Sequence, residues 1–122
     1  MILIKDMENS GTVKNFFVGT ENGEYIGKVE TLPAQATPGH VLVKVAYSTC
    51  DPYDRICSEL FKSDGFRLGG EGCGTIISVG EGVDKALHNK KISFHAGAWA
   101  QYKLIEVASS YFMILDDSQD LS

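Results

Sequence analysis

Short runs in which hydrophobic residues alternate with polar or small ones recur along the chain. In HVLVKVAYS, residues 40–48, the residues Val41, Val43 and Val45 occupy every second position and share one face of an extended segment. The positions between them form the other face: Leu42, Lys44 and Ala46. Further β-prone runs are GTIISVG at 74–80, KKISFHAGAWAQYKLIEV at 90–107 with a turn at Ala96-Gly97, and YFMIL at 111–115. The pattern predicts a chain built mainly of short strands.

The segment NFFVGTENGEYIGKVETL, residues 15–32, carries the dipeptide Asn22-Gly23 between two β-prone runs. Asn and Gly accept the positive φ angles of a two-residue turn, so this segment predicts a tight β-hairpin. The stretch LPAQATPG, residues 32–39, contains proline and glycine, but too few residues precede it to form a domain. We interpret it as a loop that enters the next strand.

One stretch, CDPYDRICSEL at residues 50–60, has the signals of a helix instead. Asp51 suits the N-cap because its carboxylate accepts a free amide hydrogen, and Pro52 suits the first helical position, where no N–H is needed. Asp54 adds negative charge to the first turn, where the helix dipole favours it. The pattern predicts one short helix at about 52–61, ending before the turn SDG at 63–65.

Many short strands, one helix and no alternation of strands with long helices predict the fold class. We expect an all-β fold, in the sense of a β-rich α+β protein built as a barrel or a sandwich. A chain of 122 residues is expected to form a single domain, 1–122. The three cysteines show no C-x-x-C spacing, which indicates reduced thiols and no disulfide framework.

Charge and hydropathy narrow the class of partner. The net charge is −5, and no basic cluster exists beyond Lys90-Lys91, which argues against a nucleic-acid or anionic-membrane surface. No apolar run approaches the ~20 residues that span a bilayer. The start MILIKDMENS lacks the long apolar core of a signal peptide. We therefore expect an intracellular protein, cytoplasmic by default.

The stretch LGGEGCGTIISVG, residues 68–80, contains five glycines. A dinucleotide fingerprint needs G-x-G-x-x-G after a strand and at the start of a helix, whereas here the spacing is G-x-G-x-G and a strand follows. Downstream, Gly80 and Gly82 are followed by Lys85 in the third glycine position, and the segment 83–89 is too short for a crossover helix. A phosphate cradle is therefore rejected, and the glycines are expected to serve tight backbone geometry.

Metal and nucleophile chemistry find little support in the residue spacing. The histidines and cysteines do not show the close spacings of zinc sites: His40, His88, His95, Cys50, Cys57 and Cys73. The chain has no G-x-S-x-G motif, and Cys73 has no base evident in the sequence. These side chains are interpreted as ordinary exposed or packed residues.

The order of motifs goes further than composition. LPAQATPGHVLVKVAYSTCDPYDR, LGGEGCGTIISVGEGV, NKKISFHAGAWAQYKLIEV and YFMIL follow one another. Together they resemble the amino-terminal, GroES-like domain of the medium-chain dehydrogenase/reductase superfamily, over about residues 32–115. The resemblance implies a GroES-like, partly open barrel with one short helix.

Zinc-bearing members of that superfamily carry a histidine ligand where this chain has Gly70, and their cysteine ligand aligns with Asp51. The four-cysteine structural zinc lobe is also absent after Gly97. The resemblance therefore implies that no zinc is bound.

The run DPYDR at 51–55 is similar to motifs of zinc-independent, NADPH-dependent double-bond reductases and of quinone oxidoreductases. By this resemblance Asp51 and Tyr53 would be catalytic residues near the nicotinamide and substrate. Tyr53 is the better proton donor, because a phenol carries a proton at neutral pH where an ionised aspartate does not. The alternative, a helix N-cap at Asp51 and a packed aromatic ring at Tyr53, is compatible with those roles.

Four further residues belong by resemblance to the wall of the active site or its structural support: Asp54, Arg55, Gly70 and Glu71. Glu71 either lies behind the active site or pairs structurally with Arg55 or Arg67, and the structural pairing is favoured.

Family members continue into a Rossmann domain that binds the cofactor, and no stretch of this chain matches one. The resemblance implies the amino-terminal domain of an NADPH-dependent oxidoreductase, incomplete and inactive alone, acting on a carbonyl, enone or quinone. A homodimer is left open. The alternative is a stand-alone GroES-like module for protein binding, and a chaperonin cofactor is a weaker third option.

Overall fold

The computed structural model describes residues 11–22, 24–49 and 67–115, and this part of the chain is nearly all strand. The elements are β1 (Thr12–Glu21), β2 (Glu24–Pro33), β3 (His40–Ser48), β4 (Glu71–Val79), the 3-10 helix η1 (Lys85–Leu87), β5 (Lys91–His95), β6 (Tyr102–Glu106) and β7 (Phe112–Ile114). The predicted all-β class is confirmed. The helix predicted at 52–61 lies outside the described residues.

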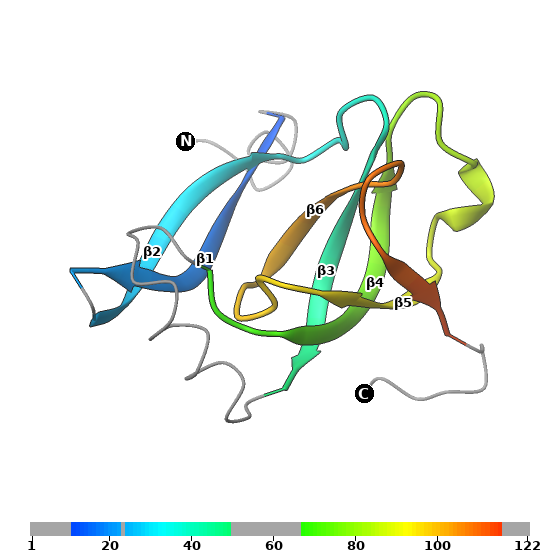
Figure 1. The fold of residues 1–122 in the computed structure, drawn as a ribbon. Coiled ribbons are helices and arrows are strands. Elements are labelled where there is room, and N and C mark those ends of the chain that lie inside the picture. Colours follow the sequence, from blue (N-terminus) through cyan, green and yellow to red (C-terminus); the bar gives the residue numbers. More distant parts are fainter. Residues whose placement is uncertain (1–10, 23, 50–66, 116–122) are drawn as a thin grey trace.

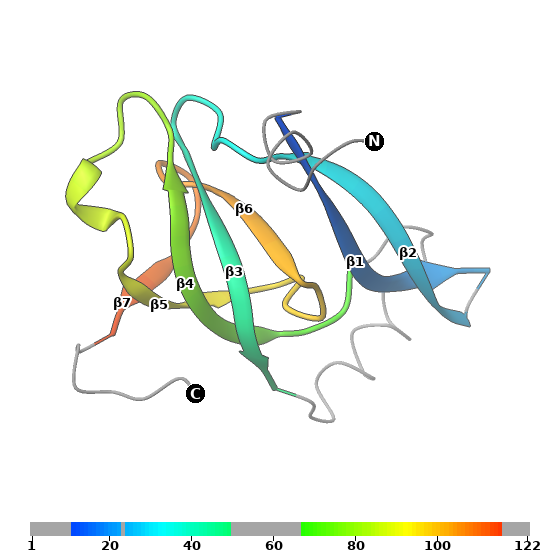
Figure 2. The ribbon, with the colours of Figure 1, turned by 180° about the vertical axis from the view of Figure 1, so that it is seen from behind.

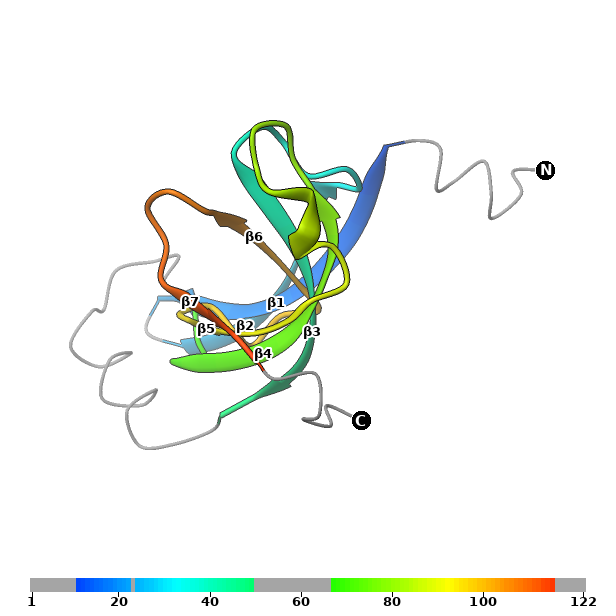
Figure 3. The same ribbon diagram turned by 90° about the vertical axis from the view of Figure 1, so that its right-hand side faces the viewer.

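Two antiparallel sheets form the fold. One is the β1–β2 hairpin, and the other has the strand order β6-β3-β4-β5-β7. Residues 107–111 alone join β6 to β7, so the two edges of the larger sheet must come near each other. The sheet curls accordingly, as the side view shows (Figure 3). The sheets do not close into a barrel, which agrees with the predicted partly open form.

The predicted hairpin is confirmed. Asn22 adopts a left-handed φ of 52°, and Glu21 pairs with Glu24 across the turn. The hairpin contacts the larger sheet through its first strand. The Val18 amide donates to the Trp99 carbonyl at 2.9 Å, and the Leu68 amide donates to the Val18 carbonyl at 3.1 Å. The segments 67–70 and 96–101 thus connect the two sheets (Figure 1).

The strands and the turn predicted at 90–107 are also present, with left-handed φ angles at Ala96 and Gly97. β5 and β6 do not pair with each other, however. β5 pairs with β4, while β6 pairs with β3 (Figure 2). The turn therefore carries the chain from one side of the β3–β4 pair to the other.

The main core lies on the inner face of the curled sheet. Val41 and Val43 are fully buried there and Val45 packs against them, as the alternation predicted. The other core residues come from the neighbouring strands and loop: Ile76, Ile92, Phe94, Ala98 and Ile105. Leu42, on the opposite face of β3, is fully buried too.

β4 begins at Glu71, three residues before the β-prone run that the sequence marks at 74. Its glycines allow close packing, as expected. A Cβ on Gly74 would stand 2.2 Å from the carbonyl oxygen of Lys44. The pairing register of β3 with β4 shifts twice, between Leu42 and Val43 and between Val45 and Tyr47. Gly69, just before the strand, has a φ of +99° that favours glycine.

No helix in the described ranges is long and apolar enough to span a bilayer.

Candidate functional site

The site lies where β3 ends beside the start of β4. A cavity of about 440 Å³ opens there, which we call the β3–β4 pocket. Its lining comes from four strands and from the residue that follows β3: Tyr47, Ser48, Thr49, Glu71, Gly72, Cys73, Ser93, Phe94, His95 and Met113. A cavity of this size, with few polar groups among apolar ones, suits a small organic molecule.

Strand register builds one wall of the pocket. Tyr47 lies opposite Cys73, Cys73 opposite Ser93, and Ser93 opposite Met113. Residues directly opposite each other in antiparallel strands share a face, so the four side chains form one row across the sheet. About half of Tyr47 and of Met113 is exposed, at 49% and 55%. The row therefore offers an accessible, mainly apolar surface.

A carboxylate and an imidazole stand beside this row. Glu71 pairs in register with His95, and Glu71 Oε1 lies 3.8 Å from His95 Nδ1. The His95 ring also contacts Tyr111, with ring centroids 5.6 Å apart. Both Glu71 and His95 are more than half exposed to water. The pair places two groups that can exchange protons at the edge of the cavity.

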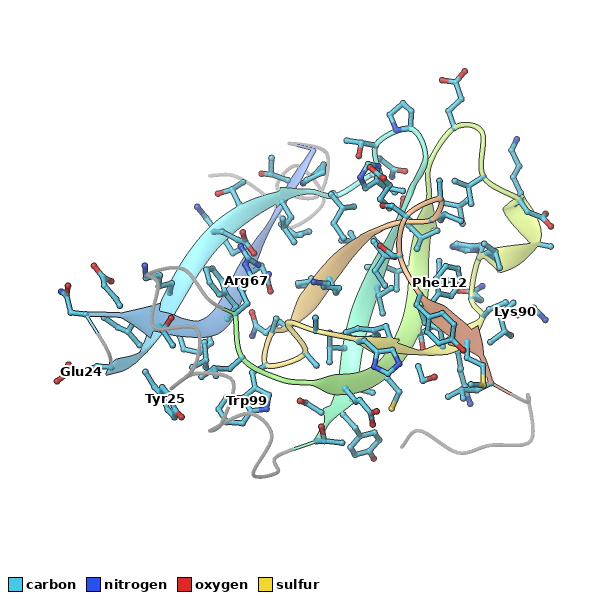
Figure 4. All side chains as sticks on the ribbon, viewed as in Figure 1. Glu24, Tyr25, Arg67, Lys90, Trp99 and Phe112 are labelled. Carbon is cyan, nitrogen blue, oxygen red and sulfur yellow. The ribbon has the colours of Figure 1, made fainter. Side chains whose placement is uncertain are left out.

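Thr49, directly after β3, is held by hydrogen bonds to β4 and to Trp99. Its amide and its Oγ1 both donate to the carbonyl of Glu71, at 2.9 Å and 3.2 Å. Its own carbonyl accepts a hydrogen bond of 2.8 Å from Trp99 Nε1. Figure 4 shows Trp99 at this end of the sheet. Thr49, which lines the pocket, precedes the DPYDR motif by two positions in the sequence.

The structure describes two of the six predicted site residues. Glu71 is the first residue of β4 and lines the pocket. Gly70 comes just before it, and its carbonyl accepts a 2.8 Å hydrogen bond from the Ala96 amide. The other four lie outside the described residues, and their roles stay predictions: Asp51, Tyr53, Asp54 and Arg55.

The suggested pairing of Glu71 with Arg67 is wrong. Arg67 instead binds Glu30 on β2 through both terminal nitrogens, with Nη1–Oε2 at 2.7 Å and Nη2–Oε1 at 2.5 Å. The reason is position: Arg67 forms a β-bridge with Gly19 of β1, so its side chain lies beside the hairpin. The alternative partner for Glu71, Arg55, lies outside the described residues.

Sequence reasoning missed most of the polar lining of the pocket, namely Thr49, Cys73, Ser93 and His95. His95 and Cys73 had been interpreted as ordinary residues because neither has a partner nearby in sequence. The available signal was the position of His95 at the end of a predicted strand, directly before the Ala96-Gly97 turn. Using that signal required the strand order, which periodicity does not supply.

The glycine turn after β4 lacks two of the free amides that a phosphate cradle would need. At the glycine turn after β4, the Gly80 amide donates to the His40 carbonyl and the Val83 amide donates to the Gly80 carbonyl, at 2.8 Å and 3.2 Å. These amides cannot also cradle a phosphate. η1, which follows, is only three residues long. Within 11–22, 24–49 and 67–115, no three His, Cys, Asp or Glu side chains gather in a way that could hold a metal ion.

Neither a protein-family model nor a curated protein sequence matches the chain. Solved structures do. A proposed NADPH:quinone reductase from Bacillus thuringiensis superimposes with a TM-score of 0.72 at 18% identity, over 88% of this chain and 35% of that one. A quinone oxidoreductase from Pseudomonas syringae pathovar tomato superimposes with a TM-score of 0.65 at 19% identity, over 88% of this chain and 35% of that one. A mycobacterial protein solved with NADPH superimposes with a TM-score of 0.64 at 21% identity, over 88% of this chain and 35% of that one.

These likenesses show the fold. The chain folds as the amino-terminal, GroES-like domain of the medium-chain dehydrogenase/reductase superfamily does, as its motif order predicted. It spans little more than a third of the length of these structures.

Proposed function

We propose that this chain supplies the substrate side of an NADPH-dependent, zinc-independent oxidoreductase that reduces a quinone or an enone. The observation that carries the proposal is the β3–β4 pocket, a cavity of about 440 Å³ in a GroES-like fold, whose lining residue Thr49 stands two positions before the DPYDR motif in the sequence. The solved structures named above as quinone reductases share that fold.

The pocket suits a flat, mainly apolar substrate. The row of Tyr47, Cys73 and Met113 offers an apolar surface, while Ser93 and Thr49 offer hydroxyl groups to a substrate oxygen. Reduction of a quinone adds a hydride and a proton, and NADPH supplies the hydride when it is bound. In this proposal Tyr53 donates the proton and Asp51 is the second catalytic residue, while Glu71 and His95 provide polar groups at the rim of the pocket.

The cofactor half of the reaction is assigned to residues beyond this chain. This division is supported by the sequence, which has no G-x-G-x-x-G motif, and by the glycine turn after β4, where the Gly80 and Val83 amides are already hydrogen-bonded. Zinc independence rests on Gly70 and Asp51, which stand where zinc-bearing members have ligands.

We expect the 122-residue chain to show no saturable binding heat when NADPH is titrated into it by isothermal calorimetry. The physical reason is that the Gly80 and Val83 amides of the glycine turn are already hydrogen-bonded, and η1 is too short to present a helix N-terminus to a pyrophosphate. A complete relative with its cofactor domain is the positive control. Tight binding of NADPH by this chain would overturn the division of the site.

A further inference from the structure

A second cavity of about 270 Å³ lies at the seam between the β1–β2 hairpin and β6. We call it the seam pocket. Its lining residues are Asn15, Glu30, Leu32, Arg67, Tyr102, Lys103 and Leu104, none of which lines the β3–β4 pocket. Figure 4 shows Arg67 between the hairpin and β6.

The carboxylate in the seam pocket is already saturated. Glu30 Oε2 accepts hydrogen bonds from Asn15 Nδ2 and from Arg67 Nη1, each at 2.7 Å, and Glu30 Oε1 accepts from Arg67 Nη2. Asn15 is fully buried, and its Oδ1 accepts a 2.9 Å hydrogen bond from the Tyr102 amide. Glu30 and Arg67 therefore neutralise each other within a satisfied network.

Lys103 is a surplus cation in the same cavity. It pairs in register with the fully buried Val43, and the next residue on its face of β6 is the core residue Ile105. Its Nζ lies only 2.9 Å from where a Cβ on Gly97 would stand, against the turn between β5 and β6. Among the described residues, no acceptor lies within hydrogen-bonding distance of this ammonium group. An inward-facing lysine whose ammonium group donates to no acceptor is unusual.

The electrostatic surroundings of Lys103 also favour a negatively charged partner. Burial lowers the pKa of the Lys103 ammonium, and the neighbouring Arg67 lowers it further, while Glu30 opposes the shift. A bound anion would offset both of the destabilising effects.

We propose that the seam pocket binds a small organic carboxylate, whose oxygens accept hydrogen bonds from Lys103 Nζ. The cavity has one surplus positive charge, because Arg67 and Glu30 cancel. A monoanion matches that charge, whereas a phosphate dianion would bring a second negative charge close to Glu30. A volume of about 270 Å³ admits an acid of a few carbon atoms.

The test titrates sodium propionate into the isotope-labelled chain at constant ionic strength and follows backbone amide resonances. Saturable shifts are expected at Gly97 and Lys103, with a Kd of roughly millimolar size. Lys103→Met should weaken binding by about tenfold or more, whereas Lys103→Arg should retain it. The control is Lys44→Met, an exposed lysine on the adjacent strand β3, which should bind as the unmodified chain does.

Two further probes decide which chemical class of ligand the seam pocket binds. Propionamide has the shape of propionate without its charge and should not bind. Inorganic phosphate should bind more weakly than propionate. The proposal is overturned if propionate causes no saturable shift, if propionamide binds as well, if phosphate binds better, or if Lys44→Met removes binding as fully as Lys103→Met does. Lys103→Arg keeps the test valid should Lys103→Met fail to fold.

Discussion

Replacing Ile76 with alanine is expected to lower the free energy of unfolding by about 2–5 kcal/mol. Ile76 is fully buried in the core on β4, in contact with residues from the neighbouring strands. The substitution removes apolar contacts and leaves a cavity that the surrounding strands fill only in part. Urea denaturation followed by circular dichroism measures the loss.

The neighbouring residue supplies a matched control. Ile77 has the same side chain on the same strand but points to the other face, where 37% of it is exposed. Ile77→Ala is expected to cost less than about 1 kcal/mol. Equal losses for the two variants would contradict the assigned faces of β4.

Replacing Arg67 with methionine is expected to lower the free energy of unfolding by about 1–3 kcal/mol at neutral pH. The guanidinium binds Glu30 through two hydrogen bonds and lies 4.0 Å from the centre of the Phe17 ring. Methionine fills part of the space but leaves Glu30 with Asn15 as its remaining donor. The expected loss is modest because the Arg67 side chain is 40% exposed and water screens its charge.

Lys28→Met is the control for this variant. Lys28 also forms an ion pair on the hairpin, with Glu21 at 3.2 Å, but both side chains are exposed. Its loss should change stability by less than about 1 kcal/mol. A cost for Lys28→Met equal to that for Arg67→Met would show that Arg67 does not tie the hairpin to the sheet.

The effect of Arg67→Met should also depend on pH. The Arg67 hydrogen bonds, and secondarily Asn15, hold the pKa of Glu30 below its ordinary value of 4.5, although partial burial opposes them. A carboxyl whose pKa is lowered by folding stabilises the protein above its unfolded pKa, and this contribution is lost as the pH falls through the folded pKa. The stability gap between the unmodified chain and Arg67→Met should therefore narrow in acid. A gap of the same size at about pH 3 as at about pH 7 would refute the assignment.

Much of the fold follows from local pattern. The valine alternation of β3, the Asn22 turn and the glycine-rich start of β4 are each visible within a few residues, because period-two burial and turn chemistry are local properties. The length of the segment after Gly82 is also a local property: it was predicted to be too short for a crossover helix, and it forms only a 3-10 turn.

The site depends on strand order, which is not local. Glu71 meets His95 because β4 pairs with β5, and Arg67 meets Glu30 because the hairpin lies beside residue 67. The partners in the second pair are 37 positions apart, and nothing in the spacing of charges marks that contact. The full burial of Leu42 also depends on what packs against the second face of β3.

The most direct test of the central claim is a titration of the isotope-labelled chain with tetramethyl-1,4-benzoquinone, whose methyl groups hinder addition by the Cys73 thiol. We predict saturable shifts of the Thr49, Glu71 and His95 amides, with the resonances of the hairpin unmoved. Ser93→Phe, which fills the β3–β4 pocket, should abolish the shifts, and Thr31→Phe on the hairpin should not. Absence of binding, or shifts that persist in Ser93→Phe, would contradict the account and favour a protein-binding module.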